Sequence, residues 1–143
     1  FVNRQPGSGT RAIVDALLAR DAIAPSRIVG YGNEEFTHAA VAAHVASGMA
    51  DVGLGVETAA RRFGLDFVPL LRERYFFAAE RDALARAPVA TLIEILRSES
   101  FRARVEALAG YDATETGRLL TIAEAFSRAS AGSASGRSPA RSR

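Results

Sequence analysis

Residues 3–11 read NRQPGSGTR and lead directly into residues 12–18, AIVDALL, whose apolar side chains have helical spacing. The two glycines of the loop let the main chain approach a ligand closely, and its serine or threonine can cap a helix. The first turn of a helix has unpaired N–H groups and carries about half a positive charge, so it attracts anions. Arg4 and Arg11 flank the loop. The stretch therefore predicts a strand-to-helix loop that binds an oxyanion.

The composition fits a compact domain or part of a larger one, with 143 residues of which 48% are hydrophobic. No apolar run reaches the roughly 18 residues of a membrane span, and the lack of Cys excludes disulfides and cysteine metal sites. Because the chain begins with Phe, we expect it to be a fragment of a longer protein, so it carries no information on a signal peptide.

The positive charge of the chain is distributed unevenly. All 18 cationic side chains are Arg; residues 1–117 hold 13 of them against 15 acidic side chains, whereas residues 118–143 hold five against one Glu. The sequence thus predicts a slightly acidic domain with a basic, low-complexity tail at 118–143, of which 129–143 should be disordered. Direct binding of nucleic acid by this chain is not expected.

Strand-like and helix-like segments alternate along the chain, which predicts an α/β fold with a largely parallel sheet. After a short strand at residues 1–2, further strands are predicted at residues 28–31, 51–56, 67–70 and 74–79. Helices are predicted at residues 10–20, 34–47, 57–63, 89–97 and 100–108, with Gly48 and Gly64 as stops of the second and third.

The glycine-rich loop has other interpretations. A P-loop is excluded because its motif requires a Lys, which this chain lacks. The pattern Gly7-x-Gly9-x-x-Ala12 fits a dinucleotide fingerprint with Glu34 as the ribose-binding acid, although three residues separate the strand from the first glycine. A nucleotide-cofactor oxidoreductase therefore stays an alternative. So does an ordinary strand-to-helix turn in which a serine or threonine of the loop, Ser8 or Thr10, is the N-cap.

Evidence for a metal site or for catalysis is weaker. Glu35-x-x-His38 resembles half of a carboxylate-bridged metal site, but a complete site needs further Glu and His ligands. Helix capping by Glu34 and Glu35 is the favoured interpretation, with His44 on a different helix face from His38. The G-x-S-x-G frame of a nucleophile elbow is missing, and the acidic residues form no evident catalytic pair. We therefore expect no metal and no enzymatic activity.

Arg4 followed by Ser8-Gly9-Thr10 resembles the first ligand loop of periplasmic tungstate- and phosphate-binding proteins. Further segments add to the resemblance: FVNRQ at 1–5, EFTHAAVAA at 35–43, ASGMADVGLG at 46–55, GLDFVPL at 64–70, ERY at 73–75 and GYDATETG at 110–117. Together they resemble the periplasmic-binding-protein-like domain of molybdate-related bacterial transcriptional regulators and molybdopterin-biosynthesis proteins.

The resemblance implies an α/β, type 2 periplasmic-binding-protein-like fold that holds its ligand between two lobes. Residues 1–70 would form lobe two with the ligand loop, a parallel-rich sheet flanked by helices. Residues 71–117 would return to lobe one through a crossover strand and helices. The domain would then be incomplete, with half of the cleft missing and apolar sheet surface uncovered.

The resemblance also implies which residues bind the ligand. The expected ligands of the oxyanion are Arg4, Ser8, Gly9, Thr10 and Arg11 from the first loop, and Tyr31, Glu35, Thr37 and His38 from the second. Arg11 opposes the helix dipole, so we expect solvent, the ligand or a nearby acid to hold it. Glu35 is expected either to face the anion or to orient an arginine.

The resulting prediction is a non-catalytic binding and sensing module. Its ligand would be molybdate or tungstate, or a pterin-type precursor, and no other cofactor is expected. The implied partners are the missing lobe-one segment and an attached DNA-binding effector domain, without a membrane span. The expected location is cytoplasmic; a periplasmic, transporter-associated binding protein and a degenerate domain without ligand are the alternatives.

Overall fold

The computed structural model describes residues 1–127, which form two compact units. Unit 1 contains Phe1–Ala78 and Arg104–Asp112, and unit 2 contains Ala79–Ala103 and the chain from Ala113 onward. The predicted disorder of residues 129–143 lies outside the described residues. Within the described part of the chain, no helix has the length and apolar character needed to cross a bilayer.

A small parallel sheet lies at the centre of unit 1. Strand β1 (Asn3–Arg4) pairs in parallel with β2 (Glu34–Glu35), in a register that places Asn3 opposite Glu34. On its other side β1 is extended by a parallel bridge between Val2 and Gly53. The order β2, β1, Gly53 makes β1 the central strand. This sheet agrees with the predicted α/β class, although its strands are much shorter than expected.

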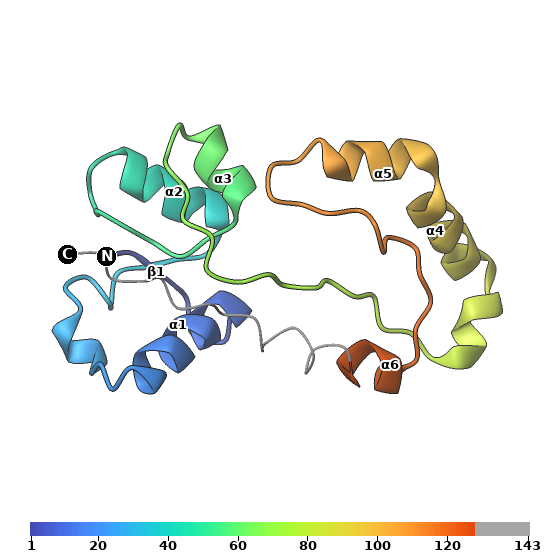
Figure 1. The fold of residues 1–143 in the computed structure, drawn as a ribbon, viewed down its shortest axis with the longest axis horizontal. Coiled ribbons are helices and arrows are strands. Elements are labelled where there is room, and N and C mark those ends of the chain that lie inside the picture. Colours follow the sequence, from blue (N-terminus) through green and yellow to red (C-terminus); the bar gives the residue numbers. More distant parts are fainter. Residues whose placement is uncertain (128–143) are drawn as a thin grey trace, which may run out of the picture. The chain divides into compact units, whose positions relative to one another are not determined.

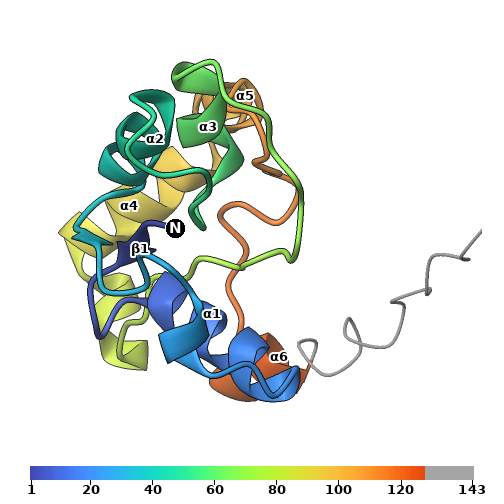
Figure 2. The same cartoon turned by 90° about the vertical axis from the view of Figure 1, so that its left-hand side faces the viewer.

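Each of these three strand segments is followed by a helix. Helix α1 (Gly9–Arg20) follows β1, α2 (His38–Ala46) follows β2, and α3 (Glu57–Arg62) follows the bridge at Gly53. Figures 1 and 2 show α1 on one side of β1, and α2 and α3 on the other. Because parallel strands run in one direction, their strand-to-helix loops come to the same edge of the sheet.

The core of unit 1 packs α2 against the central strand. Val2 is fully buried and clusters with Val41 and Ala50, with Val45 beside them. A Cβ at Gly53 would lie 2.6 Å from Cγ1 of Val41 and 2.9 Å from Cγ1 of Val2. Only glycine therefore lets this strand approach α2 so closely.

Three predicted strands are wrong. Residues 28–31 form turns after a 3-10 helix, η1 (Pro25–Arg27), and Gly30 has a φ of +84° because it lies against the main chain of Phe1. Residues 67–70 and 74–79 contain no strand; they lie in an extended, exposed segment with Val68, Tyr75 and Phe77 each at least 69% exposed. Residues with high β-propensity form a strand only when another strand is there to pair with them.

The second predicted helix begins four residues later than expected. Residues 34 and 35 belong to β2, and the hydroxyl of Thr37 caps α2 by accepting a hydrogen bond from the Ala40 N–H at 2.9 Å. Capping by the two glutamates is therefore wrong. The predicted glycine stops are confirmed, since Gly48 and Gly64 have φ of +76° and +69° directly after α2 and α3.

Unit 2 is helical. It contains η2 (Arg81–Ala85), α4 (Ala87–Arg97), the start of α5 (Glu99–Glu106) and α6 (Ile122–Ser127). The structure confirms the predicted helices at 89–97 and 100–108 to within two residues at each end. Helix α6 lies in the segment predicted as a low-complexity tail, where no helix was expected.

Candidate functional site

The loop between β1 and α1 forms the first part of the site. Ser8 is the N-cap of α1: its Oγ accepts a hydrogen bond from the Arg11 N–H at 3.1 Å and donates one to the Gln5 carbonyl at 3.0 Å. The next two amides, those of Gly9 and Thr10, have no acceptor inside the helix. A hollow of about 240 Å³ lies against this turn; its lining residues are Pro6, Gly7, Ser8, Gly9, Arg11, Ala12 and Asp15.

Arg4 connects this loop to the second one. Its Nη2 donates a hydrogen bond to the Phe36 carbonyl at 3.0 Å, and its Nε donates one to Oε1 of Gln5 at 3.1 Å. Both acceptors are neutral. Among residues 1–127, the structure places no carboxylate within ion-pair distance of this guanidinium. Arg4 thus holds a positive charge, not neutralised by an acid, across the two strand-to-helix loops.

Arg11, in contrast, is surrounded by acceptors of the protein itself. Its guanidinium contacts Asp15 at 3.1 Å and Glu34 at 3.0 Å, and it lies 4.4 Å from the ring centre of Tyr31. Burial lowers the pKa of Arg11, but hydrogen bonds to Glu34, Tyr31 and Asp15 outweigh it and raise the pKa above the ordinary value. Of the three alternatives for Arg11, namely solvent, the ligand or a nearby acid, the structure shows nearby acids, which leaves its charge less available to a ligand.

Tyr31 takes part in the same cluster. Its hydroxyl donates a short hydrogen bond to Oδ1 of Asp15, which lowers the pKa of the Asp15 carboxyl and raises that of the tyrosine. Tyr31 therefore supports Arg11 rather than the loop that precedes α1. The cluster ties α1 to β2 and to the turn before it.

The second strand-to-helix loop brings Thr37 and His38 to the same edge of the sheet as the first loop. Nδ1 of His38 is buried and has no hydrogen-bond partner in the described part of the chain, and a Cβ at Gly55 would lie 3.6 Å from it. Burial lowers the pKa of the imidazole below its ordinary 6.5, the charge of Arg4 lowers it further, and that of Glu73 acts in the opposite direction. His38 is therefore largely neutral at pH 7.

We expected Glu35 to face the anion or to orient an arginine, but the structure shows it beside a histidine. Its Oε1 lies 3.2 Å from Nδ1 of His44, nine residues further along, so the glutamate pairs with α2. His44 therefore has an acidic partner, whereas His38 does not pair with Glu35. Within residues 1–127 no three His, Cys, Asp or Glu side chains come together in a way that could hold a metal ion.

Two further predicted residues have clear positions. Thr10 is buried to 9% exposure inside the first turn of α1, and Gly9 is exposed at the start of that helix. Sequence reasoning missed Asn3, which is 1% exposed; its Oδ1 accepts from the Arg4 N–H at 3.0 Å and its Nδ2 donates to the Tyr31 carbonyl at 3.2 Å. An Asn within an otherwise apolar strand start was the available signal, since a buried amide must find such partners.

Two adjacent loops at one edge of the sheet supply helix amides, one guanidinium that has no acidic partner among residues 1–127, and a neutral imidazole. These N–H groups suit the oxygen atoms of an anion. The hydroxyls of Ser8 and Thr37 already cap helices, so they position these groups.

Comparison of the sequence with known proteins shows the family of the chain. The family model described as the PBP superfamily domain matches residues 1–97. Uncharacterized protein YvgK of Bacillus subtilis (strain 168) is 36% identical over 122 residues, which are 84% of this chain and 38% of that protein. The chain thus spans well under half of the length of that relative.

A second relative is matched over most of its length. The uncharacterized protein in the ferredoxin 2Fe-2S gene 5′ region of Clostridium pasteurianum is 38% identical over 100 residues, which are 69% of this chain and 88% of that protein. No solved structure matches the chain significantly. The family match covers well over half of the chain and includes both strand-to-helix loops. The chain therefore belongs to the PBP superfamily, whose domains have a periplasmic-binding-protein-like fold.

Proposed function

We propose that unit 1 binds a small oxyanion, without chemistry, at the shared edge of the loops that follow β1 and β2. The observation that carries the proposal is the position of Arg4, whose guanidinium spans the two loops through its hydrogen bond to the Phe36 carbonyl. An anion placed there would meet one fork of N–H donors and the starts of α1 and α2.

The N–H donors of the two loops favour an anion over a cation. Each helix start contributes roughly half a positive charge, and the amides of Gly9, Thr10, His38 and Ala39 have no acceptor in their own helices. Glu34 is paired with Arg11, and Oε1 of Glu35 contacts Nδ1 of His44. A ligand carboxylate, phosphate or molybdate group would therefore meet the N–H donors of the helix starts and the guanidinium of Arg4.

We propose molybdate or tungstate as the ligand, on the strength of the resemblance to molybdate-related domains. The family supports small-ligand binding in general, and the names of the two relatives state no ligand. On this proposal the protein is a transcriptional regulator or a molybdenum-cofactor-related protein in the cytoplasm, with a DNA-binding effector domain. A periplasmic, transporter-associated binding protein is the main variant.

Ligand binding would shift the equilibrium between an open and a closed conformation of the two lobes. In a two-lobed binding domain, an anion that contacts both lobes stabilises the closed form by its differential affinity. The second lobe would supply the remaining ligands and an interface with the effector domain. The loop between β1 and α1, with Arg4, would then form one half of the ligand site.

The test is isothermal titration of the intact protein with molybdate, tungstate, sulfate and phosphate at constant ionic strength. The proposal expects saturable binding of at least one of them that is lost in Arg4→Gln and kept in Arg20→Gln, whose arginine pairs with Asp21 on the surface. Folded protein that binds none of the four anions would contradict it.

A dinucleotide cofactor is the competing proposal, because α1 begins within Gly7-x-Gly9-x-x-Ala12. Its ribose-binding acid, Glu34, is already engaged by Arg11 at 3.0 Å. A cofactor site predicts NAD(H) or NADP(H) binding that is weakened by Gly9→Val and indifferent to Arg4→Gln. The anion site predicts that Arg4→Gln removes binding and that the cofactors do not bind.

A further inference from the structure

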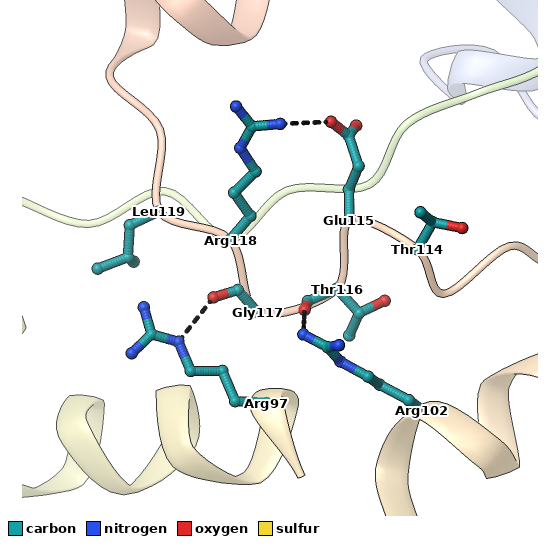
Figure 3. A pocket seen from close by; sticks show the side chains of 8 residues that line it. All are labelled: Arg97, Arg102, Thr114, Glu115, Thr116, Gly117, Arg118 and Leu119. Carbon is teal, nitrogen blue, oxygen red and sulfur yellow. Dashed lines mark hydrogen bonds and ion pairs between the residues drawn. The ribbon is translucent and has the colours of Figure 1, made fainter. Parts of the chain in front are cut away.

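Unit 2 contains a second hollow that is independent of the site in unit 1. It has a volume of about 600 Å³ and lies between the loop at residues 114–119 and two helices, α4 and α5. Figure 3 shows Arg97 and Arg102 reaching from these helices toward the loop. Most of the residues that line it are exposed, so the hollow is open to solvent.

The loop is held to the helices by main-chain acceptors. Nε of Arg97 donates to the Gly117 carbonyl at 3.0 Å, and Nη2 of Arg102 donates to the Thr116 carbonyl at 3.0 Å (Figure 3). Gly117 has a φ of +78°, and a Cβ there would lie 2.6 Å from Cγ of Arg97. The close approach of the loop to α4 therefore requires glycine.

Among the described residues, these contacts use one N–H group each of Arg97 and Arg102. A guanidinium carries five N–H groups, and each of the two donates one hydrogen bond to the loop. The third arginine of the hollow, Arg118, pairs with Glu115 at 3.0 Å. Over residues 1–127, neither Arg97 nor Arg102 has a carboxylate within ion-pair distance. With three cations against one acid, the lining has a net charge of +2.

An apolar element accompanies the charges. Leu119 lines the hollow and is 51% exposed, so its side chain is accessible to a ligand. Guanidinium forks match the geometry of carboxylate and phosphate groups, and an apolar wall favours a carbon skeleton over a bare inorganic ion.

We propose that this hollow binds a small organic polyanion through its carboxylate or phosphate groups, with Arg97 and Arg102 as the anchoring residues and Leu119 against the carbon skeleton. The site belongs to unit 2 alone and is distinct from the anion site proposed for unit 1. Such a ligand would stabilise the loop at 114–119 against the two helices.

The experiment is an NMR titration of the arginine side-chain Nε–H signals of the intact protein with citrate, with fructose 1,6-bisphosphate and with inorganic phosphate, at constant ionic strength. We expect saturable shifts of the Arg97 and Arg102 signals with one organic anion or both, which distinguishes carboxylate from phosphate, and weaker effects of inorganic phosphate. The signal of Arg86, an exposed arginine at the start of α4, is the internal control.

Variants separate binding from loop support. Arg97→Lys and Arg102→Lys keep the charge but lose the fork, so they should weaken the response at least tenfold, whereas Arg86→Lys should leave it unchanged. If Arg97 and Arg102 only held the loop against the helices and bound no anion, their wild-type signals would show no saturable shifts. Absence of saturable shifts, or equal shifts at Arg86, would overturn the proposal.

Discussion

The guanidinium of Arg4 donates a hydrogen bond to the main-chain carbonyl of Phe36, 3.0 Å away, across the gap between the first and second strand-to-helix loops of unit 1. The two residues are 32 positions apart in the sequence, and pairing of β1 with β2 brings them together. The contact places a positive charge, which has no acidic partner among the described residues 1–127, at the edge of the sheet where both helices begin.

Replacing this arginine should affect binding more than folding. Arg4→Gln removes a charge whose present acceptors are two neutral oxygens, so the free energy of unfolding should change by less than about 1 kcal/mol. Anion affinity should fall by at least about tenfold, because a charge-assisted hydrogen bond contributes about 1.5–3 kcal/mol. Urea unfolding and calorimetric titration measure the two effects. A large loss of stability with unchanged affinity would contradict this assignment.

Replacing Arg11 should have the opposite effect. Arg11→Gln leaves Glu34 and Asp15 without their cation, and the arginine side chain is only 14% exposed. We expect unfolding free energy to fall by about 1–3 kcal/mol, while affinity for the anion changes little in protein that is still folded. The control is Arg20→Gln, where the side chain is 68% exposed and a change within about 0.5 kcal/mol is expected.

Ser8 allows a separation of helix capping from anion binding. Ser8→Ala removes the N-cap of α1 and should cost about 1 kcal/mol of stability. Ser8→Asp keeps a capping oxygen and suits the helix dipole but cannot donate to the Gln5 carbonyl, so it should be more stable than Ser8→Ala. Its carboxylate would nevertheless repel an anion at the same turn. Retained molybdate binding in a stably folded Ser8→Asp protein would argue against the loop as the binding site.

His38 should make the fold sensitive to mild acid. Its folded-state pKa lies below the ordinary 6.5 because burial and Arg4 both disfavour the imidazolium, although Glu73 favours it. The unfolded state therefore binds a proton more readily, and stability should fall as pH decreases through about 6.5. His38→Gln should flatten this part of the profile, measured by urea unfolding between pH 8 and 5.5. The same slope in both proteins would show that another group is responsible.

Local signals in the sequence predicted the helices well. The Ser8 cap, the glycine stops at 48 and 64 and the apolar spacing of residues 12–18 act within a few residues, and the structure follows them. The α/β class also followed, because Asn3 and Arg4 precede a helix and pair in parallel with β2.

Long-range partners could not be predicted in the same way. The exposed, apolar segment around Tyr75 has the residue types of a strand, but strand formation depends on a neighbour that β-propensity does not encode. Likewise, Glu35 pairs with His44 and Arg11 with Glu34 because β2 replaces the first turn of the expected helix. The start of α2, four residues later than expected, thus decides which side chains Glu35 and Arg11 pair with.

The location of the anion is most directly tested by backbone amide NMR of the intact protein during titration with molybdate. The central claim predicts that the amide signals of Gly9 and Thr10, at the start of α1, shift together with those of His38 and Ala39, at the start of α2, with a single dissociation constant. Shifts at only one of the two helices, or binding that leaves all four amides unchanged, would contradict it.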